Sequence, residues 1–578
     1  MRLPNQLLQG FAAATFGTII VQAQASCSDS FSPLTASAFT ASLSPGWNLG
    51  NTLDAFPTEG SWNNAPVESS TFDDVKAAGF KSVRIPEVTW AYHFTGSSNE
   101  GDSPNWDLDP SWLQRVSDVI DMVTDRGLYV IVNAHHDSAL WANVAISGAN
   151  YTMIEEKFYR LWYQIGTSLG CKASTVAFEP INEPPGSTAE HAAELNKLNN
   201  VFLQAINDAG GFNSQRVVTL VGPGEDMART SQYFERPDPI YTNPYALQVH
   251  YYSPYAFTSA AWGKTIWGSD ADKQALESDF SLLRNNFTDI PVVIGEWLVS
   301  PVMTETAGRW RYYDYLSQMA VKYNFATIIW DSGADHLDRA AHAWHDPTSL
   351  SVHANALMSI SNSLPDATTD SSLTTQFTSA YIFHRLGSTV QDYDLLFKLN
   401  GNSVSSITDG STTLSAGTQY YLEGDNITIS ASYLSDYFAS SATGVLGTLI
   451  ITFSAGTAIP VQILQWDVPV ATTTSAKAIA GNDTAVSITW KGLGKPATVS
   501  AYKSDGSFLV DDWTIYLGPL EQGRTTFGGQ WNFAWNQAGV TITGTAASAV
   551  VAANQSTTFV VEAYPRVAGN SANFTLTV

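Results

Sequence analysis

The sequence is poor in cysteine and in charge, and basic residues are the scarcer of its charges. Its 578 residues include only two cysteines, Cys27 and Cys171, without Cys-x-x-Cys spacing, which argues against a structural zinc site. Charged residues make up 14% of the chain, and 28 Lys and Arg oppose 53 Asp and Glu, a net charge of −25. Such a surface repels phosphate backbones, so nucleic acid is excluded as an expected partner.

Long apolar runs are also missing, and the longest begins near the N-terminus. Arg2 precedes an apolar stretch from Phe11 to Val21, and Ala23-Gln24-Ala25 matches an A-x-A cleavage pattern. The stretch is too short to span a bilayer, so we expect no membrane association. We expect residues 1–25 to be a signal peptide and the mature protein to be secreted and extracellular; the alternative is a buried N-terminal helix.

Export would permit two kinds of covalent modification. Cys27 and Cys171 could pair in an oxidising compartment, although the sequence leaves the pairing open. Six Asn-x-Ser/Thr sequons support surface glycosylation in a eukaryotic host: Asn150, Asn286, Asn426, Asn482, Asn554 and Asn573.

Aromatic residues are plentiful, with 18 Trp and 24 Tyr. Their flat faces suit the apolar faces of sugar rings, whereas the alternative is that they fill cores, as most single aromatics do. The hydrophobic content of 44% is that of a globular protein, and a chain of this length predicts several domains.

Strand and helix signals alternate between residues 44 and 365. The strand candidates are near-continuous apolar runs, typical of parallel strands buried on both faces. Eight such units predict an α/β fold, a (β/α)8 TIM barrel over residues 26–365, with the active site at the strand C-terminal ends. A doubly wound sheet would need a Gly-rich nucleotide loop, which is missing. The strands expected are Trp47–Leu49, Ser82–Ile85, Tyr129–Ala134, Thr175–Ile181, Val217–Val221, Ala246–Tyr252, Pro291–Gly295 and Thr327–Trp330.

The amino-acid composition and the hydrophobic pattern change after Pro365. Residues 366–374 form a short polar linker, and the rest is rich in Ser, Thr, Val, Gly and Ala in alternating runs. A second polar break at 471–475 separates residues 375–470 from 476–578. We therefore expect two small all-β, immunoglobulin-like sandwich domains.

Two carboxylates follow apolar strands and form the candidate catalytic pair. Glu183 ends the fourth predicted strand within Phe178-Glu-Pro-Ile-Asn-Glu-Pro184, and Glu296 ends the seventh within Val292-Val-Ile-Gly-Glu-Trp297. Retaining glycoside hydrolysis needs two carboxyl groups about 5–5.5 Å apart, one as acid/base and one as nucleophile. We assign Glu183 as acid/base, its pKa raised by burial and by the charge of Glu296, and Glu296 as nucleophile.

Two neighbours of this pair receive roles from the same argument. Asn182, beside Glu183, could hydrogen-bond the sugar 2-OH. Glu179 lies inside the strand and should pair with a basic group, because a lone buried carboxylate is costly.

The strand-end motifs resemble those of glycoside hydrolase family 5, the cellulase and mannanase family, over roughly residues 44–350. The resemblance rests on these segments: Trp47-Asn-Leu-Gly-Asn-Thr-Leu-Asp-Ala55, Val83-Arg-Ile-Pro86, Val132-Asn-Ala-His-His-Asp137, Phe178–Pro184, His250-Tyr-Tyr252, Val292–Trp297 and Trp330.

The resemblance implies roles for five supporting residues. Arg84 would hold Glu296 ionised, since an adjacent cation lowers the pKa of a carboxyl group. Tyr252 would donate a hydrogen bond to Glu296. His135 and His250 would line the subsite of the distorted sugar, and Trp330 would be its stacking floor.

No cofactor or metal is implied. The pair His135-His136 could ligate a metal, but adjacent residues on a strand point to opposite faces, which makes joint ligation difficult.

The C-terminal half also resembles known modules. Residues 375–470 are similar to the immunoglobulin-like module of multidomain cellulases, and 476–578 to carbohydrate-binding module family 46. Trp531 and Trp535 are four apart, so on one strand both would face the same side, about 13 Å apart, and could stack on glucan. The alternative is that they belong to a sandwich core.

These features predict a monomeric endo-β-1,4-glucanase that acts on cellulose, β-glucan or xyloglucan. A mannanase or other β-glycanase on the same barrel is the nearest alternative. A non-catalytic carbohydrate-binding protein would lack Glu183, Glu296 or Arg84, and all three are present. A structural wall protein would leave the Asn-Glu-Pro strand end unexplained.

Overall fold

Eight parallel strands close into a barrel in the part of the chain that the structure describes, as the sequence predicts. The structure is a computed structural model and describes residues 25–28, 30–85, 89–96, 101–510 and 512–578, so the predicted signal peptide lies outside the described residues except for Ala25. β1 pairs with both β2 and β8, which closes the ring. The strands are β1 (Gly46–Asn48), β2 (Ser82–Ile85), β3 (Tyr129–Asn133), β4 (Val176–Glu179), β5 (Val218–Val221), β6 (Tyr245–His250), β7 (Val292–Glu296) and β8 (Phe325–Ile329).

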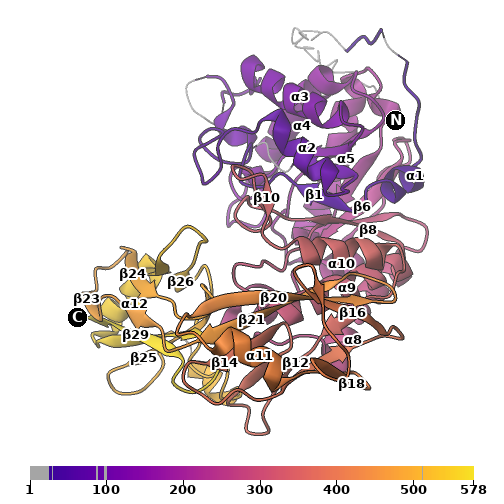
Figure 1. Ribbon diagram of the computed structural model, residues 1–578. Coiled ribbons are helices and arrows are strands. Elements are labelled where there is room, and N and C mark those ends of the chain that lie inside the picture. Colours follow the sequence, from indigo (N-terminus) through magenta and orange to yellow (C-terminus); the bar gives the residue numbers. More distant parts are fainter. Residues whose placement is uncertain (1–24, 29, 86–88, 97–100, 511) are drawn as a thin grey trace, which may run out of the picture.

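Helices surround the barrel, as the alternating pattern predicts (Figure 1). The helix expected at Trp112–Arg126 is α3, Pro110–Thr124. It begins earlier because Asp109 caps it by accepting the Ser111 N–H, and Pro110 suits the first helical position. The others are α2 (Ser69–Ala77), α4 (Tyr151–Leu169), α5 (Ala189–Asp208), α6 (Met227–Tyr233), α7 (Tyr255–Thr258), α8 (Asp270–Asn286), α9 (Thr306–Tyr323) and α10 (Pro347–Leu357). None of the described helices has the length and apolarity to cross a bilayer.

Helix α1 (Ala36–Ala41) closes the N-terminal end of the barrel. Phe39 and Leu43 are fully buried against inward-facing strand residues such as Ile131, Val293 and Ile328. The opposite end, where the strands terminate, therefore remains as the mouth.

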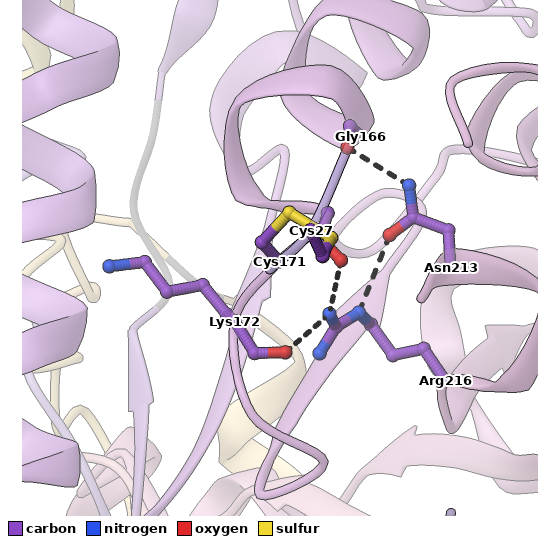
Figure 2. Close-up of a disulfide and its surroundings, with 7 residues drawn as sticks. Cys27, Gly166, Cys171, Lys172, Asn213 and Arg216 are labelled. Atoms are coloured by element: carbon purple, nitrogen blue, oxygen red, sulfur yellow. Dashed lines mark hydrogen bonds between the residues drawn. A yellow bond between two sulfur atoms is a disulfide. The ribbon is translucent and has the colours of Figure 1, made fainter. Parts of the chain in front are cut away.

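A disulfide bond joins Cys27 to Cys171 beside this closed end (Figure 2). Cys171 follows α4, in the turn that leads to β4, so the bond fixes the N-terminal segment to the base of the barrel. The fully buried Arg216 braces the turn by donating to the carbonyls of Gly170 and Lys172 at 3.2 and 2.7 Å. The pairing left open by the sequence is thus formed.

Two β-rich modules follow the barrel, coloured orange and yellow in Figure 1. The first has sheets of order β11-β15-β19-β18 and β14-β21-β20-β16-β17, with helix α11 (Ala431–Phe438). Its strands are β11 (Leu364–Pro365), β12 (Ala367–Thr369), β13 (Gln376–Thr378), β14 (Tyr381–Arg385), β15 (Tyr393–Lys398), β16 (Val404–Asp409), β17 (Thr412–Thr413), β18 (Tyr420–Glu423), β19 (Asn426–Ile429), β20 (Gly444–Phe453) and β21 (Ile459–Trp466). β12 lies inside the segment expected to be a linker and pairs with β13.

The second module has sheets of order β22-β24-β27-β26 and β23-β29-β28-β25, with helix α12 (Gly544–Ala553). Neither α11 nor α12 is anticipated by the alternating pattern. The domain boundaries read from the sequence stay predictions. The strands are β22 (Val470–Ala471), β23 (Ser475–Lys477), β24 (Thr484–Thr489), β25 (Pro496–Lys503), β26 (Trp531–Asn532), β27 (Gly539–Ile542), β28 (Thr557–Ala563) and β29 (Ser571–Thr577).

Two buried basic side chains dock the second module onto the barrel. Lys495 donates to the carbonyls of Pro301 and Thr304 at 2.6 and 2.9 Å. Arg566 donates to the carbonyl of Gly263 at 2.9 Å. Both side chains are at most 6% exposed, so these contacts are shielded from water and salt.

Candidate active site

Two carboxylates meet at the barrel mouth. Glu296 is the last residue of β7, and Glu183 lies in the loop four residues after the end of β4. One carboxylate oxygen of Glu183 and one of Glu296 lie within 4.8 Å of each other. The pair lies close to the spacing of retaining glycosidases, about 5–5.5 Å, and well short of the 6.5–9.5 Å of inverting ones.

Arg84 and Tyr252 hold Glu296. Arg84 Nη1 donates to Glu296 Oε1 at 2.6 Å, and the Tyr252 hydroxyl donates to Oε2 at 2.8 Å. Burial lowers the pKa of Arg84, but the charges of Glu179, Glu296 and Glu225 raise it well above its ordinary value, so the guanidinium stays charged. Both contacts expected from the resemblance are therefore present.

Glu179 pairs with Arg84 rather than with a substrate. Its two oxygens accept from Arg84 Nε and Nη2 at 2.8 and 2.7 Å, and Asn133 Nδ2 donates to it at 2.8 Å. Gln248, on the inner face of β6, also donates to it. The side chain is fully buried, and the structural ion pair expected for it is confirmed.

His250 lies among three carboxylates. Its Nδ1 is 2.7 Å from Glu183 Oε1 and 3.6 Å from Glu296 Oε2, and its Nε2 is 3.2 Å from Glu225 Oε2. Burial lowers the pKa of His250, but the charges of Glu225, Glu296 and Glu183 outweigh it and raise the pKa to about 9. A protonated His250 therefore faces Glu183 at neutral pH.

This cation reverses the expectation for the Glu183 pKa. Burial raises that pKa, but the hydrogen bond and charge of His250, with more distant Arg84 and His136, lower it below its ordinary value. The predicted upward shift is wrong because the prediction considered burial and the charge of Glu296 but not the contact with His250.

Three further candidates lie around the same mouth. Asn182 Oδ1 accepts from Arg84 Nη2 at 2.8 Å, next to Glu183. The rings of His135 and Trp330 stack in parallel, 5.9 Å apart. Trp330 lies against Gly50, where an added Cβ would come within 2.8 Å of the indole, so glycine is needed there. Their sugar-binding roles stay predictions.

The geometry assumed for the two adjacent histidines is wrong. β3 ends at Asn133, so neither histidine lies on the strand: His135 precedes a short 3-10 helix that begins at His136, and their rings are 4.6 Å apart. One nitrogen from each and a carboxylate oxygen of Asp54 all lie within 4.8 Å of one another. His136 Nε2 lies 3.5 Å from Asp54 Oδ2, which makes this cluster an ion pair when His136 is protonated.

The two tryptophans of the last module do not share one face. β26 contains only Trp531 and Asn532, so the strand ends before Trp535. Trp531 is 1% exposed in the module core, which makes it unavailable for sugar stacking. Trp535 is 42% exposed and stacks on His345 of the barrel.

Glu225 is a site residue that the sequence reading missed. It follows β5 after Gly-Pro-Gly, is fully buried, and accepts the main-chain N–H of Glu183 at 2.7 Å. Its position after a barrel strand was the available signal.

A pocket of about 670 Å³ opens beside Glu183 and is lined by Glu183, His250, Tyr252, Asp226, Arg229 and Tyr255. Buried charges, a close carboxylate pair and an open pocket fit glycosidic bond cleavage. A family model described as Cellulase (glycosyl hydrolase family 5) matches residues 48–336, which include Arg84, Glu183, Glu225, His250, Tyr252 and Glu296. The chain belongs to glycosyl hydrolase family 5.

Relatives of this family 5 protein share its three-module organisation. It is similar to a solved tri-modular GH5 (subfamily 4) endo-β-1,4-glucanase from Bacillus licheniformis, with 30% identity and a TM-score of 0.79 over 94% of this chain and 100% of that one. The same Bacillus protein complexed with cellotetraose matches with a TM-score of 0.80, again at 30% identity, over 94% and 99% of the two chains.

Sequence relatives agree with the solved structures. Endoglucanase B of Paenibacillus lautus is 25% identical over 512 residues, 86% of this chain and 85% of that protein. A xyloglucan-specific endo-β-1,4-glucanase of Bacteroides ovatus is 28% identical over 360 residues, 55% of this chain and 70% of that protein. A family model described as Carbohydrate binding domain X2 matches residues 376–463, within the first β-rich module.

Proposed function

We propose that this protein is a retaining endo-β-1,4-glucanase in which Glu183 is the acid/base and Glu296 the nucleophile. The observation that carries the proposal is the approach of their carboxylate oxygens to within 4.8 Å at the mouth of a family 5 barrel. A water molecule could not be accommodated between the two groups and the sugar at this spacing, so a direct attack by Glu296 is favoured.

The reaction proceeds in two steps. In the first, Glu296 Oε attacks the anomeric carbon while Glu183 donates a proton to the departing glycosidic oxygen, which forms a glycosyl-enzyme ester and frees the leaving sugar. In the second, Glu183 takes a proton from water, whose oxygen attacks the anomeric carbon and releases Glu296 as carboxylate. Arg84 and Tyr252 stabilise that carboxylate before and after.

The first step needs a proton at Glu183, although the pKa of this group is lowered. His250 supplies the explanation: its Nδ1 is 2.7 Å from Glu183 Oε1, and its pKa is raised to about 9. The Glu183–His250 pair therefore holds a proton through neutral pH. That proton moves along the hydrogen bond onto Glu183 as negative charge develops on the glycosidic oxygen.

The substrate class follows from the relatives. The similar proteins are endoglucanases, one of them solved with cellotetraose and another xyloglucan-specific, which favours a β-1,4-glucan backbone over mannan. His135 and His250 would line the subsite of the distorted sugar, Asn182 would bind its 2-OH, and Trp330 would be its floor.

We also propose that the last module extends the glucan-binding surface. Its Trp513 is 43% exposed and packs against Trp262 of the barrel. The two rings are in an edge-to-face arrangement, with their centroids 4.8 Å apart. Trp535 lines a second pocket, of about 780 Å³, together with barrel loop residues such as Asn64 and His342. These two tryptophans, rather than Trp531, are the candidates for sugar contact.

Secretion is the expected location, since the Cys27–Cys171 disulfide suits an oxidising compartment. The monomeric state and the use of the six sequons stay predictions.

Two measurements test the proposed function. Products from cellulose, mixed-linkage β-glucan, xyloglucan and mannan should show internal cleavage of one or more glucans, while inactivity on all three glucans contradicts the assignment. A 2-deoxy-2-fluoro-cellobioside with a good leaving group should label Glu296, as found by peptide mass spectrometry. Labelling of another carboxylate would reject the nucleophile assignment.

A further inference from the structure

The loop after β5 is joined to the turn that carries Glu183. The Gly224 N–H donates to the carbonyl of Pro184 at 2.8 Å. The Glu183 N–H donates in return to Glu225 Oε2 at 2.7 Å. Glu183 and Glu225 are 42 residues apart in the chain and lie in different loops. The side chain of Glu225 therefore holds the main chain of Glu183 from a separate loop.

Glu183 needs such support because its backbone is strained. Its φ is +39°, in the left-handed region that side chains other than glycine rarely adopt. Such conformations persist only where the surroundings hold them, and they gather at active sites. Without the Glu225 acceptor, the turn would relax toward negative φ and carry the carboxylate away from its place opposite Glu296.

Glu225 also contacts the ring behind Glu183. The same oxygen, Oε2, lies 3.2 Å from His250 Nε2, in a geometry that falls short of a hydrogen bond. The other ring nitrogen, Nδ1, is 2.7 Å from Glu183 Oε1. One oxygen thus touches both the main chain of Glu183 and the histidine that contacts its side chain.

The environment of Glu225 is energetically unfavourable, which indicates that this residue has a functional role. Glu225 is fully buried, and its Oε1 has no hydrogen-bond partner among the described residues. Glu225 is also itself in the left-handed region, with φ of +49°. A half-satisfied buried carboxyl group on a strained backbone destabilises the fold, so a structural role alone explains it poorly.

We propose that Glu225 is a positioning residue for the acid/base catalyst: by accepting the Glu183 N–H and backing His250, it holds the Glu183 carboxyl where the leaving oxygen will be. The inference rests on the proposed function of Glu183. It predicts that losing Glu225 impairs proton donation specifically, rather than the active site in general.

The leaving group of the substrate separates these effects. Phenyl β-cellobioside needs a proton on its leaving oxygen, whereas 2,4-dinitrophenyl β-cellobioside departs without one. The variants are Glu225→Ala, which removes the acceptor, and Glu225→Gln, whose amide oxygen can replace Oε2 in both contacts. Asp314→Asn is the control, because it changes another buried acid to its amide on α9, away from the mouth.

We expect Glu225→Ala to lower kcat/KM for the phenyl substrate by about 10- to 100-fold, a large part of a general acid's contribution, and for the dinitrophenyl substrate by less than about threefold. Glu225→Gln should recover most of the loss, and Asp314→Asn should change neither value. Equal losses on both substrates, no loss, or equal impairment by Gln and Ala would overturn the proposal. Thermal unfolding of each variant identifies a fold defect, and the Gln variant keeps the test valid if the Ala variant fails to fold.

Glu183→Gln distinguishes failure of this proposal from failure of the proposed function. It should show the same substrate dependence in a stronger form. If it does and Glu225→Ala does not, only the positioning role is wrong. If Glu183→Gln itself shows no dependence on the leaving group, the acid/base assignment is wrong as well.

Discussion

Arg84 binds Glu296 and Glu179 with different edges of one guanidinium group: Nη1 donates to Glu296 Oε1 at 2.6 Å, and Nε and Nη2 donate to the two oxygens of Glu179. All three side chains are at most 6% exposed. A single planar cation therefore balances a structural carboxylate and the proposed nucleophile together.

Arg84→Lys should impair the enzyme although it preserves the charge. An ammonium group cannot present the planar fork that contacts both carboxylates, so one of them loses its partner. We expect a loss of kcat of at least about tenfold, since hydrogen bonds to charged groups contribute about 1.5–3 kcal/mol. Initial rates on β-glucan measure it, with Arg126→Lys, at an exposed pair with Asp73, as the control. Unchanged kcat would contradict this account of Arg84.

Tyr252→Phe should lower activity with little effect on stability. The variant removes one hydrogen bond to Glu296 and leaves the ring in place, so we expect kcat to fall about 10- to 100-fold. Tyr251→Phe is the matched control, because that hydroxyl donates to Asp279 instead. Equal effects of the two substitutions on kcat would show that the contact with Glu296 is not special.

Replacing both Cys27 and Cys171 with Ser should destabilise the protein without changing kcat. The bond closes a loop across 144 residues at the base of the barrel, and loss of a native disulfide typically costs about 2–5 kcal/mol. The expected outcome is a lower Tm with normal initial rates at 25 °C. A large fall in kcat for the folded variant would mean that this bond shapes the mouth.

Glu225→Gln should gain stability relative to the parent as pH rises. Burial raises the pKa of Glu225 to about 8, partly offset by His250 and with a further rise from Glu179. Because the pKa of Glu225 is higher in the folded than in the unfolded protein, its contribution to the free energy of unfolding is fully present below about pH 4.5, the pKa in the unfolded chain. This contribution is lost as pH rises toward 8. Glutamine does not ionise, so the Tm difference, variant minus parent, should increase from pH 5 to 9. A constant difference would mean that Glu225 does not titrate in this range.

Trp513→Ala and Trp535→Ala should weaken action on polymer more than on short oligosaccharides. Both rings are partly exposed beside the barrel, so their loss removes stacking surface beyond the catalytic pocket. We expect a several-fold lower kcat/KM on β-glucan and an unchanged value on phenyl β-cellobioside. Phe377→Ala, an exposed aromatic residue of the first module, is the control. Equal kinetics of all three variants on polymer would reject the extended surface.

The barrel and the position of two carboxylates at its mouth could be predicted because each depends on local pattern. A strand buried on both faces is a continuous apolar run, and a charged residue that ends it, such as Glu296, must lie at the mouth. Arg84 was identified only through the family resemblance, which also implied its contact with Glu296. The pairing of Glu179 followed from the cost of a lone buried charge.

The errors concern relationships that span separate loops. Glu225 follows a Gly-Pro-Gly turn that looks ordinary in the sequence, and only the packing of two loops brings it under Glu183. The sign of the Glu183 pKa shift depends on the hydrogen bond and the charge of His250, which comes from β6. The prediction that Trp531 could stack on glucan assumed that one strand carries both Trp531 and Trp535. The separation of two tryptophans in the sequence does not show that the strand between them is only two residues long.

The fixed end of the barrel has a practical consequence for attaching this enzyme to a solid support. Helix α1 and the Cys27–Cys171 bond both lie at the end of the barrel remote from Glu183 and Glu296. A bead or scaffold protein coupled to the residues just before Cys27 would leave the mouth facing the surrounding slurry. Coupling through the last module would instead bring the support next to the tryptophans that border the mouth.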